Sequence, residues 1–194
     1  MYLTRIYLDH TKPNMQSNSV YRLHGYFSHH FEHQPLWRCE ADYIIILHED
    51  EHNFSDFEKQ FAIEGTVETK SFDNIYNSIE KSKKYFFKLR AHPVKKSQGK
   101  EIPLKDSREK IEWLTAQADK YGFRVETMAI TDTNVVCFKH REGHKVTLTT
   151  MVVEGILCVE DVDTFKKAVV EGLGRKKTFG YGLLSIVPAS KCSK

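Results

Sequence analysis

The feature that most constrains the fold of this chain is a glycine-rich segment near its C-terminus, GLGRKKTFGYG at residues 172–182. Two Gly-x-Gly pairs enclose three consecutive cations, and the residues concerned are Gly172, Gly174, Gly180 and Gly182, with Arg175, Lys176 and Lys177 between them. Glycine permits a positive φ and the close approach of another backbone. Such a loop can therefore direct amide N–H groups and cations toward one anion. A helix end followed by a surface turn and a strand has the same pattern, and this alternative stays open.

The segment differs from the two best-known glycine-rich phosphate motifs. It matches neither G-x-x-x-x-G-K-[ST] nor G-x-G-x-x-G. It also follows a predicted helix and precedes a predicted strand, which is the reverse of the order in those motifs. The sequence therefore gives no support for a nucleotide-binding loop.

Positive charge is concentrated in two segments, although the net charge of the 194 residues is only +3. Residues 83–110 carry ten Lys or Arg against three Asp or Glu, which is +7, and residues 172–194 carry five against none, which is +5. The net charge of the remaining residues is therefore +3 − 7 − 5 = −9. Cations gathered in this way predict a face that binds a polyanion. The alternative for each segment taken alone is a solvated lysine-rich loop.

Composition places the chain among ordinary globular proteins, with 40% apolar and 28% charged residues. No apolar run approaches the roughly 18 residues of a membrane-spanning helix, and residues 1–8 lack the features of a signal peptide and predict a strand. The four cysteines form no C-x-x-C pair: Cys39, Cys137, Cys158 and Cys192. We therefore expect reduced thiols, no ribbon-type zinc site, no membrane association and a cytoplasmic location.

Hydrophobic periodicity predicts alternating helices and strands in both halves of the chain. In the first half we expect strands at 2–8, 37–40, 43–48 and 85–91 and helices at 18–32 and 55–63, with 66–80 ambiguous. Residues 95–100 predict an exposed loop or hairpin. In the second half we expect helices at 106–121 and 161–172 and strands at 123–131, 135–140, 145–159 and 181–187.

Each half thus has the order strand, helix, strands, helix, strand. This order predicts an α+β protein of two tandem ferredoxin-like βαββαβ domains, the architecture of the RNA-recognition fold. We place the boundary at the basic stretch, which gives domains at 1–94 and 95–194.

Four motifs occur in an order that resembles a known family: YRLH at 21–24, FFKLRAHPVK at 86–95, EGIL at 154–157, and the glycine-rich segment with its following LLS. Together they resemble the CRISPR-associated repeat-processing endoribonucleases of the CasE type, found in type I-E Cascade complexes. The glycine-rich signature alone is shared by the wider repeat-associated RNA-binding superfamily. The resemblance implies a protein without cofactor or metal that binds the hairpin of a CRISPR repeat transcript and cuts once at its 3′ base. It also implies that the protein stays with the mature guide RNA beside other Cascade subunits.

The implied reaction is a transesterification, in which a ribose 2′-hydroxyl attacks the adjacent phosphate and expels the 5′-oxygen of the next nucleotide. The products are a 2′,3′-cyclic phosphate and a 5′-hydroxyl. His24 can transfer a proton near neutral pH, and Tyr21, one helical turn earlier, can bind the phosphate or position the hydroxyl. The second proton-transfer group stays open because several histidines crowd the end of the same helix. The expected phosphate contacts are Lys95, Lys96, Lys100, Lys105, Arg175, Lys176 and Lys177.

Two other functions remain as alternatives. One is a non-catalytic RNA-binding subunit of a CRISPR ribonucleoprotein, in which His24 has no chemical role. The other is a metal-dependent hydrolase, because His29 and His33 have the i, i+4 spacing of zinc ligands. No nearby carboxylate or thiol spacing completes such a site, so we predict no metal. Cleavage of repeat RNA in EDTA would be expected only of the metal-independent endoribonuclease, and of neither alternative.

Overall fold

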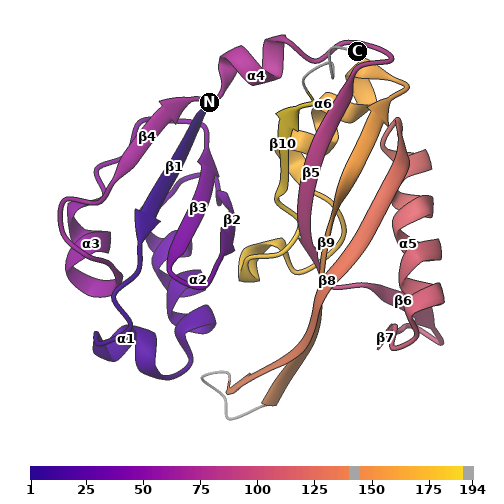
Figure 1. Ribbon diagram of the computed structural model, residues 1–194. Helices are drawn as coiled ribbons and strands as arrows, with labels where there is room; N and C mark the ends of the chain where they lie inside the picture. Colours follow the sequence, from indigo (N-terminus) through magenta and orange to yellow (C-terminus); the bar gives the residue numbers. More distant parts are fainter. Residues whose placement is uncertain (140–144, 190–194) are drawn as a thin grey trace.

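The computed structural model describes residues 1–139 and 145–189, which form two halves, each with an antiparallel sheet and helices on one face (Figure 1). The first half contains a four-stranded sheet in the order β2-β3-β1-β4. Its elements are β1 (Tyr2–Tyr7), α1 (Pro13–Gln16), α2 (Ser19–His30), β2 (Leu36–Cys39), β3 (Tyr43–His48), α3 (Ser55–Phe61), β4 (Glu68–Ser71) and α4 (Asp73–Asn77). The ambiguous segment 66–80 is thus a short edge strand followed by a short helix.

The second half has a four-stranded sheet in the order β10-β5-β9-β8 and a separate two-stranded hairpin, β6-β7. Its elements are β5 (Lys84–Ala91), β6 (Val94–Ser97), β7 (Lys100–Pro103), α5 (Ser107–Lys120), β8 (Phe123–Lys139), β9 (Lys145–Val159), α6 (Val162–Glu171), the 3₁₀ helix η1 (Lys177–Phe179) and β10 (Leu184–Pro188). In both sheets the first strand of the half pairs with the third and the fourth, and the second is at an edge. The predicted pair of ferredoxin-like units is confirmed.

The strand pairing moves the boundary between the units. We expected it between residues 94 and 95, with the strand at 85–91 closing the first half. Instead β5 pairs antiparallel with both β9 and β10, so the division between the two sheets falls between β4 and β5. The error has a physical cause: β5 is apolar on alternate positions, and this pattern says that one face is buried without saying against which sheet.

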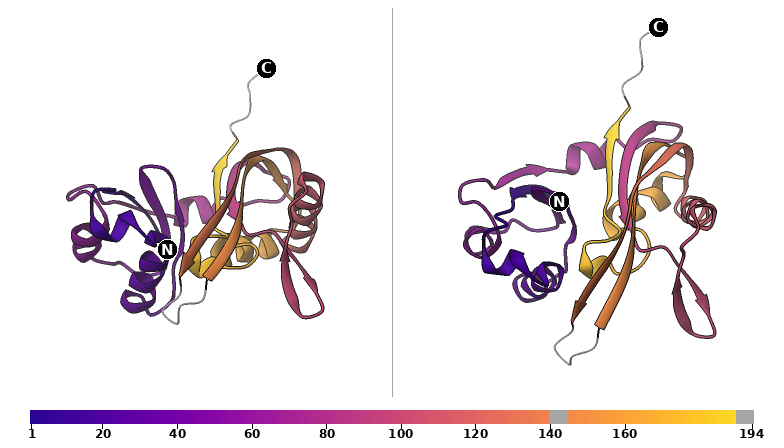
Figure 2. Two further views of the ribbon diagram at one scale, coloured as in Figure 1. Left: turned by 90° about the horizontal axis from the view of Figure 1, so that it is seen from below. Right: turned by 60° about the horizontal axis from the view of Figure 1, so that its bottom comes forward.

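The predicted hairpin in the basic stretch is present, and Figure 2 shows it extending beside α5, away from the rest of the second half. The strands predicted at 123–131 and 135–140 are one strand, β8, with irregular register near Thr127 and Asp132. Residue 140 lies outside the described residues. Gly155 of β9 lies opposite the first irregularity, and a Cβ there would overlap the Thr127 carbonyl. A bulge bends a strand without ending it, so β8 and β9 both run on as long, curved strands.

Polar caps fix the ends of the helices in the second half. The Asp106 side chain accepts hydrogen bonds from the backbone N–H groups of Arg108 and Glu109 and begins α5, as predicted. The Asp161 side chain accepts from the N–H of Thr164 and begins α6. That helix ends at Gly172, whose φ of 73° is easily adopted only by glycine.

Hydrogen bonds join β2 of the first half to β5 and to the segment before β10 of the second. The buried Arg38 guanidinium donates to the backbone oxygens of Lys88 and Leu183, both at 3.2 Å. The Arg90 guanidinium donates in the opposite direction, to the Cys39 carbonyl oxygen at 3.2 Å. Leu36 and Leu47 belong to the same buried cluster as the core of the second half. The two halves therefore share packing as well as hydrogen bonds. Within the described residues, no helix is long and apolar enough to cross a membrane.

Candidate functional site

Helix α2 places Tyr21 and His24 along one side, as their spacing predicted, and Ser28 one turn after His24. The opposite side buries Leu23 and Phe27 in the core of the first half. Tyr21 and His24 are half-buried, and their ring centroids are 6.2 Å apart. The amphipathic helix thus keeps His24 partly accessible beside Tyr21.

The His24 ring is held by residues from three parts of the chain. Its Nδ1 lies 3.2 Å from the Gln34 amide nitrogen and 3.4 Å from Ser28 Oγ. Its ring centroid lies 4.5 Å from that of Phe179 in η1. Phe138 of β8 lies between Phe179, at 5.2 Å, and Tyr21, at 6.0 Å. The glycine-rich segment therefore lies directly against the helix that carries the predicted catalytic pair.

A surface groove of about 590 Å³ runs along this part of α2. Its lining includes Tyr21, His24, Ser28 and His29, together with Arg22 from α2 and Gln60 from α3. The groove brings the Tyr21 hydroxyl, three imidazoles and a guanidinium together in a partly open site. Such a set can bind a phosphodiester and exchange protons with it.

The four glycines of the segment pack against neighbouring residues. A Cβ on Gly180 would lie 2.6 Å from the Trp37 ring of β2, and one on Gly172 would lie 2.9 Å from Leu36. All four have φ between 73° and 88°. Gly174 likewise lies close to the Trp113 ring, and Gly182 lies close to the Leu173 backbone. These glycines hold the loop between the two halves, and their expected part in binding RNA stays a prediction.

The predicted cations lie in three places: beside Glu101, along or just after the hairpin, and in a pocket between the halves. Glu101 of β7 forms ion pairs with Arg175 and with Lys176, the latter at 3.6 Å, and so joins the glycine-rich loop to the basic hairpin. Partial burial raises the pKa of Glu101, but the Arg175 hydrogen bond and the Lys176 charge outweigh it and leave the pKa below its usual value. The basic segments, some 70 residues apart in sequence, are thus adjacent. Lys191 and Lys194 lie outside the described residues.

The hairpin cations have different surroundings. Lys95 forms an ion pair with Glu109 at 2.7 Å. Lys96 is exposed and lines a hollow at the base of the hairpin together with Arg175 and Trp113. Lys100 and Lys105 are exposed. The hairpin therefore presents cations to solvent beside the glycine-rich loop.

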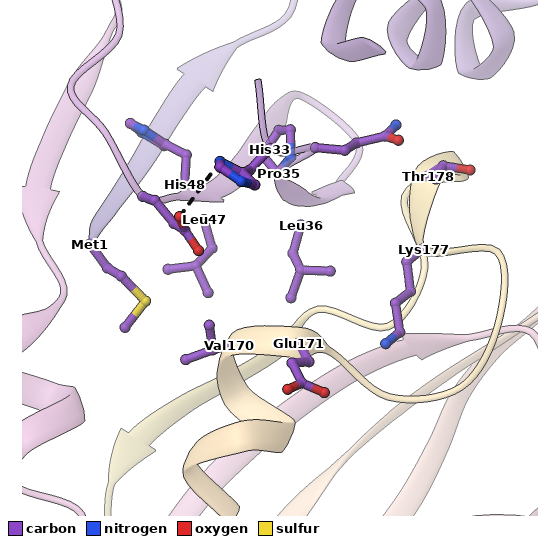
Figure 3. Close-up of a pocket in the computed structure, with 12 residues that line it drawn as sticks. Met1, His33, Pro35, Leu36, Leu47, His48, Val170, Glu171, Lys177 and Thr178 are labelled. Carbon is purple, nitrogen blue, oxygen red and sulfur yellow. Dashed lines mark ion pairs between the residues drawn. The ribbon is translucent and has the colours of Figure 1, made fainter. Parts of the chain in front are cut away.

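Lys177 is directed elsewhere. It lines a pocket of about 460 Å³ between the halves, opposite Pro35 and Leu36 (Figure 3). His33 in the same pocket lies beside Glu49, with 3.9 Å between His33 Nδ1 and Glu49 Oε2 (Figure 3). The three consecutive cations of the loop are therefore divided between two surfaces.

Sequence reasoning missed three residues that surround the Tyr21–His24 pair: Gln34 and Phe179 contact His24, and Phe138 contacts Tyr21. Gln34 lies in a loop and Phe138 on a strand far along the chain, so helical spacing could not identify either. The expected i, i+4 pair of His29 and His33 is also separated, because α2 ends at His30. Among the residues that the structure describes, no group of three or more His, Cys, Asp or Glu is arranged to hold a metal ion.

Comparison with known proteins gives matches in families, sequences and structures. A model of the family described as "CRISPR associated protein" matches residues 1–188. The CRISPR-associated endoribonuclease Cse3 of Thermus thermophilus is 30% identical over 115 residues, which is 53% of this chain and 54% of that protein. The CRISPR system Cascade subunit CasE of Escherichia coli is 24% identical over 211 aligned residues, covering 97% of this chain and 100% of that protein.

Among solved structures, CRISPR endoribonuclease Cse3 bound to a 19-nucleotide RNA has a TM-score of 0.84 at 23% identity, covering 97% of this chain and 100% of that one. At this identity the match concerns the fold, and it agrees with the two ferredoxin-like units. The sequence match to Cse3 spans about half the length of each protein, whereas the family model spans almost the whole chain. The chain therefore belongs to the CRISPR associated protein family.

Proposed function

We propose that this chain is a metal-independent endoribonuclease that binds CRISPR repeat hairpins and cuts precursor CRISPR RNA at the 3′ base of the stem. The observation that carries the proposal is that Tyr21 and His24 line one groove while Phe179 of the glycine-rich segment packs against the His24 ring. The same segment is joined to the basic hairpin through Glu101. The names of the two relatives, an endoribonuclease and a Cascade subunit, support it.

The chemistry is the attack of a 2′-hydroxyl on the neighbouring phosphate. One group removes the proton from this hydroxyl, and a second gives a proton to the departing 5′-oxygen, so that a 2′,3′-cyclic phosphate and a 5′-hydroxyl are formed. His24 performs one of these transfers, and Tyr21 binds the phosphate or orients the hydroxyl. His29 is our candidate for the other transfer, because it lines the same groove. Without resident metal, charge on the phosphate is offset by cations such as Arg22.

RNA binding is assigned to the exposed cations of the hairpin and to Arg175 and Lys176. A-form RNA has a deep, narrow major groove, so a repeat hairpin is recognised largely by shape and backbone. A projecting β-hairpin with lysines at 95, 96 and 100 suits contact with such a backbone. After cleavage we expect the protein to keep the guide RNA and to assemble with other Cascade subunits. The unpaired state of Cys39, Cys137 and Cys158 agrees with a cytoplasmic location.

The decisive experiment is incubation with repeat RNA in EDTA. The proposed function predicts one cut at the base of the stem, with a cyclic phosphate at the new 3′ end. The same RNA with a 2′-deoxynucleotide before the cut should bind and stay intact, since the nucleophile is absent. Hydrolysis of the deoxy substrate would show that water is the nucleophile. Binding without any cleavage would favour the non-catalytic subunit, and cleavage only with added metal would favour the metal-dependent hydrolase.

A further inference from the structure

Gln34 contacts His24 from the loop that follows α2. Its amide nitrogen lies 3.2 Å from His24 Nδ1, and Ser28 Oγ approaches the same atom to 3.4 Å. The two ring nitrogens lie on opposite edges of an imidazole. A ring held through Nδ1 therefore directs Nε2 away from Gln34.

The position of Gln34 is fixed by the packing between the halves. Gln34 precedes Pro35, and a residue before proline is restricted to extended conformations. Pro35 and Leu36 are buried, and Leu36 lies against Gly172 at the start of the glycine-rich segment. The loop that carries the amide is thus held by the same joint that brings Phe179 to within 4.5 Å of the His24 ring.

We propose that Gln34 is a positioning residue for His24, an inference that rests on the proposed function. Gln34 fixes one edge of the imidazole while Phe179 packs against the ring, and we assign proton exchange with RNA to Nε2. The amide suits this task in both protonation states. Its N–H donates to Nδ1 of the neutral ring, which then carries its proton on Nε2, and the reversed amide accepts from the Nδ1–H of the imidazolium.

The kinetic test compares Gln34→Met, Gln34→Glu and the control Gln16→Met in single-turnover cleavage from pH 5 to 9. Gln16 is an exposed glutamine of α1 whose amide donates to the Thr11 carbonyl oxygen. We expect Gln34→Met to lower the cleavage rate constant about tenfold or more at unchanged RNA affinity, because a misplaced proton-transfer group is inefficient. Gln16→Met should behave as the wild type.

The Gln34→Glu variant tests the contact by the direction in which it shifts the titration of His24. A carboxylate at Nδ1 favours the imidazolium, so the limb of the pH–rate profile that depends on His24 should move to higher pH by about one unit. The other titratable groups that line the described part of the groove are Tyr21, Arg22, Tyr26, His29 and His30. NMR titration of the ¹⁵N-labelled histidines identifies the limb that belongs to His24 and needs no RNA. In the wild type, at a pH where the His24 imidazole is neutral, the ring should be the Nε2–H tautomer.

The outcomes separate this inference from the proposed function. Wild-type cleavage with a normal rate in Gln34→Met and an unmoved His24 titration in Gln34→Glu would overturn the role of Gln34 alone. A Gln34→Met variant that loses activity but keeps the wild-type tautomer and pH profile would also overturn it, since the loss would then be structural. A wild-type protein that binds repeat RNA without cutting it would refute the proposed function, and this inference with it.

Discussion

At the scale of single residues, His24 is the group on which the proposed chemistry depends. A proton-transfer residue acts mainly in the transition state. We therefore expect His24→Ala to lower the single-turnover cleavage rate about 10²-fold or more, with little change in hairpin affinity. His33→Ala is the matched control, because His33 faces the pocket between the halves and lies beside Glu49. A near wild-type rate for His24→Ala would remove His24 from the mechanism.

Gly180 is a second residue at which a single added carbon atom should have a large effect on stability. An added Cβ meets the Trp37 ring at 2.6 Å, and the φ of 82° is costly for any other residue. We expect Gly180→Ala to lower the free energy of unfolding by about 2–3 kcal/mol, of which overpacking gives the larger part. Gly65→Ala is the control: its φ is 76°, but nothing lies within 4 Å, so it should cost only about 1 kcal/mol. Equal values in urea unfolding would contradict the packing argument.

At the scale of elements, the hairpin β6-β7 and the glycine-rich loop form one basic surface joined by Glu101. Each phosphate contact adds about 0.9 to the slope of log K against log[salt] for duplex and about 0.7 for single strands. The double variants Lys95→Ala/Lys96→Ala and Arg175→Ala/Lys176→Ala should each flatten this slope by up to about two units.

The control for this surface is Lys70→Ala/Lys81→Ala, which removes two exposed lysines outside the basic segments. Its salt slope should equal that of the wild type. An unchanged slope in the Lys95/Lys96 variant would mean that the hairpin is a solvated element, leaving the glycine-rich loop as the principal RNA-binding element.

At the scale of the whole molecule, Arg38 joins the two halves. Its buried guanidinium pairs with Glu40 at 2.8 Å and donates to two backbone oxygens of the second half. Arg38→Met leaves these groups without their partner, and we expect a loss of about 3 kcal/mol in the free energy of unfolding. Arg5→Met, which breaks an exposed ion pair with Glu68, should change stability little by comparison. Similar losses in the two variants would show that the joint does not depend on Arg38.

Glu40 should make this joint sensitive to acid. Burial raises the pKa of Glu40, but the hydrogen bond and charge of Arg38, with those of Lys88, leave the pKa below its ordinary value of 4.5. A carboxyl group whose pKa is lower in the folded state stabilises the fold above its unfolded pKa. This contribution is lost as the pH falls from about 4.5 through the folded pKa. Arg38→Met removes the main cause of the lowered Glu40 pKa, so the free energy of unfolding lost between about pH 7 and pH 4 should be smaller in Arg38→Met than in the wild type. An equal loss in the two proteins would exclude this role for Glu40.

The sequence by itself determined the local structure. Periodicity identified helix α2 and its stripe of Tyr21 and His24, and Asp106 and Asp161 marked the beginnings of their helices. The glycine and lysine patterns indicated the loop and the hairpin. These predictions succeed because they depend on spacing of a few residues along the chain, which local backbone geometry translates directly into position.

Only the tertiary structure decided which sheet β5 joins and which residues surround His24. The strand pattern of β5 states that one face is buried, but long-range pairing selects β9 and β10 as its partners. Gln34 and Phe179 reach His24 because Leu36 and Trp37 pack closely against Gly172 and Gly180, where no side chain intervenes. Contacts between residues so distant in sequence leave no periodic trace, since the packing of the two halves creates them.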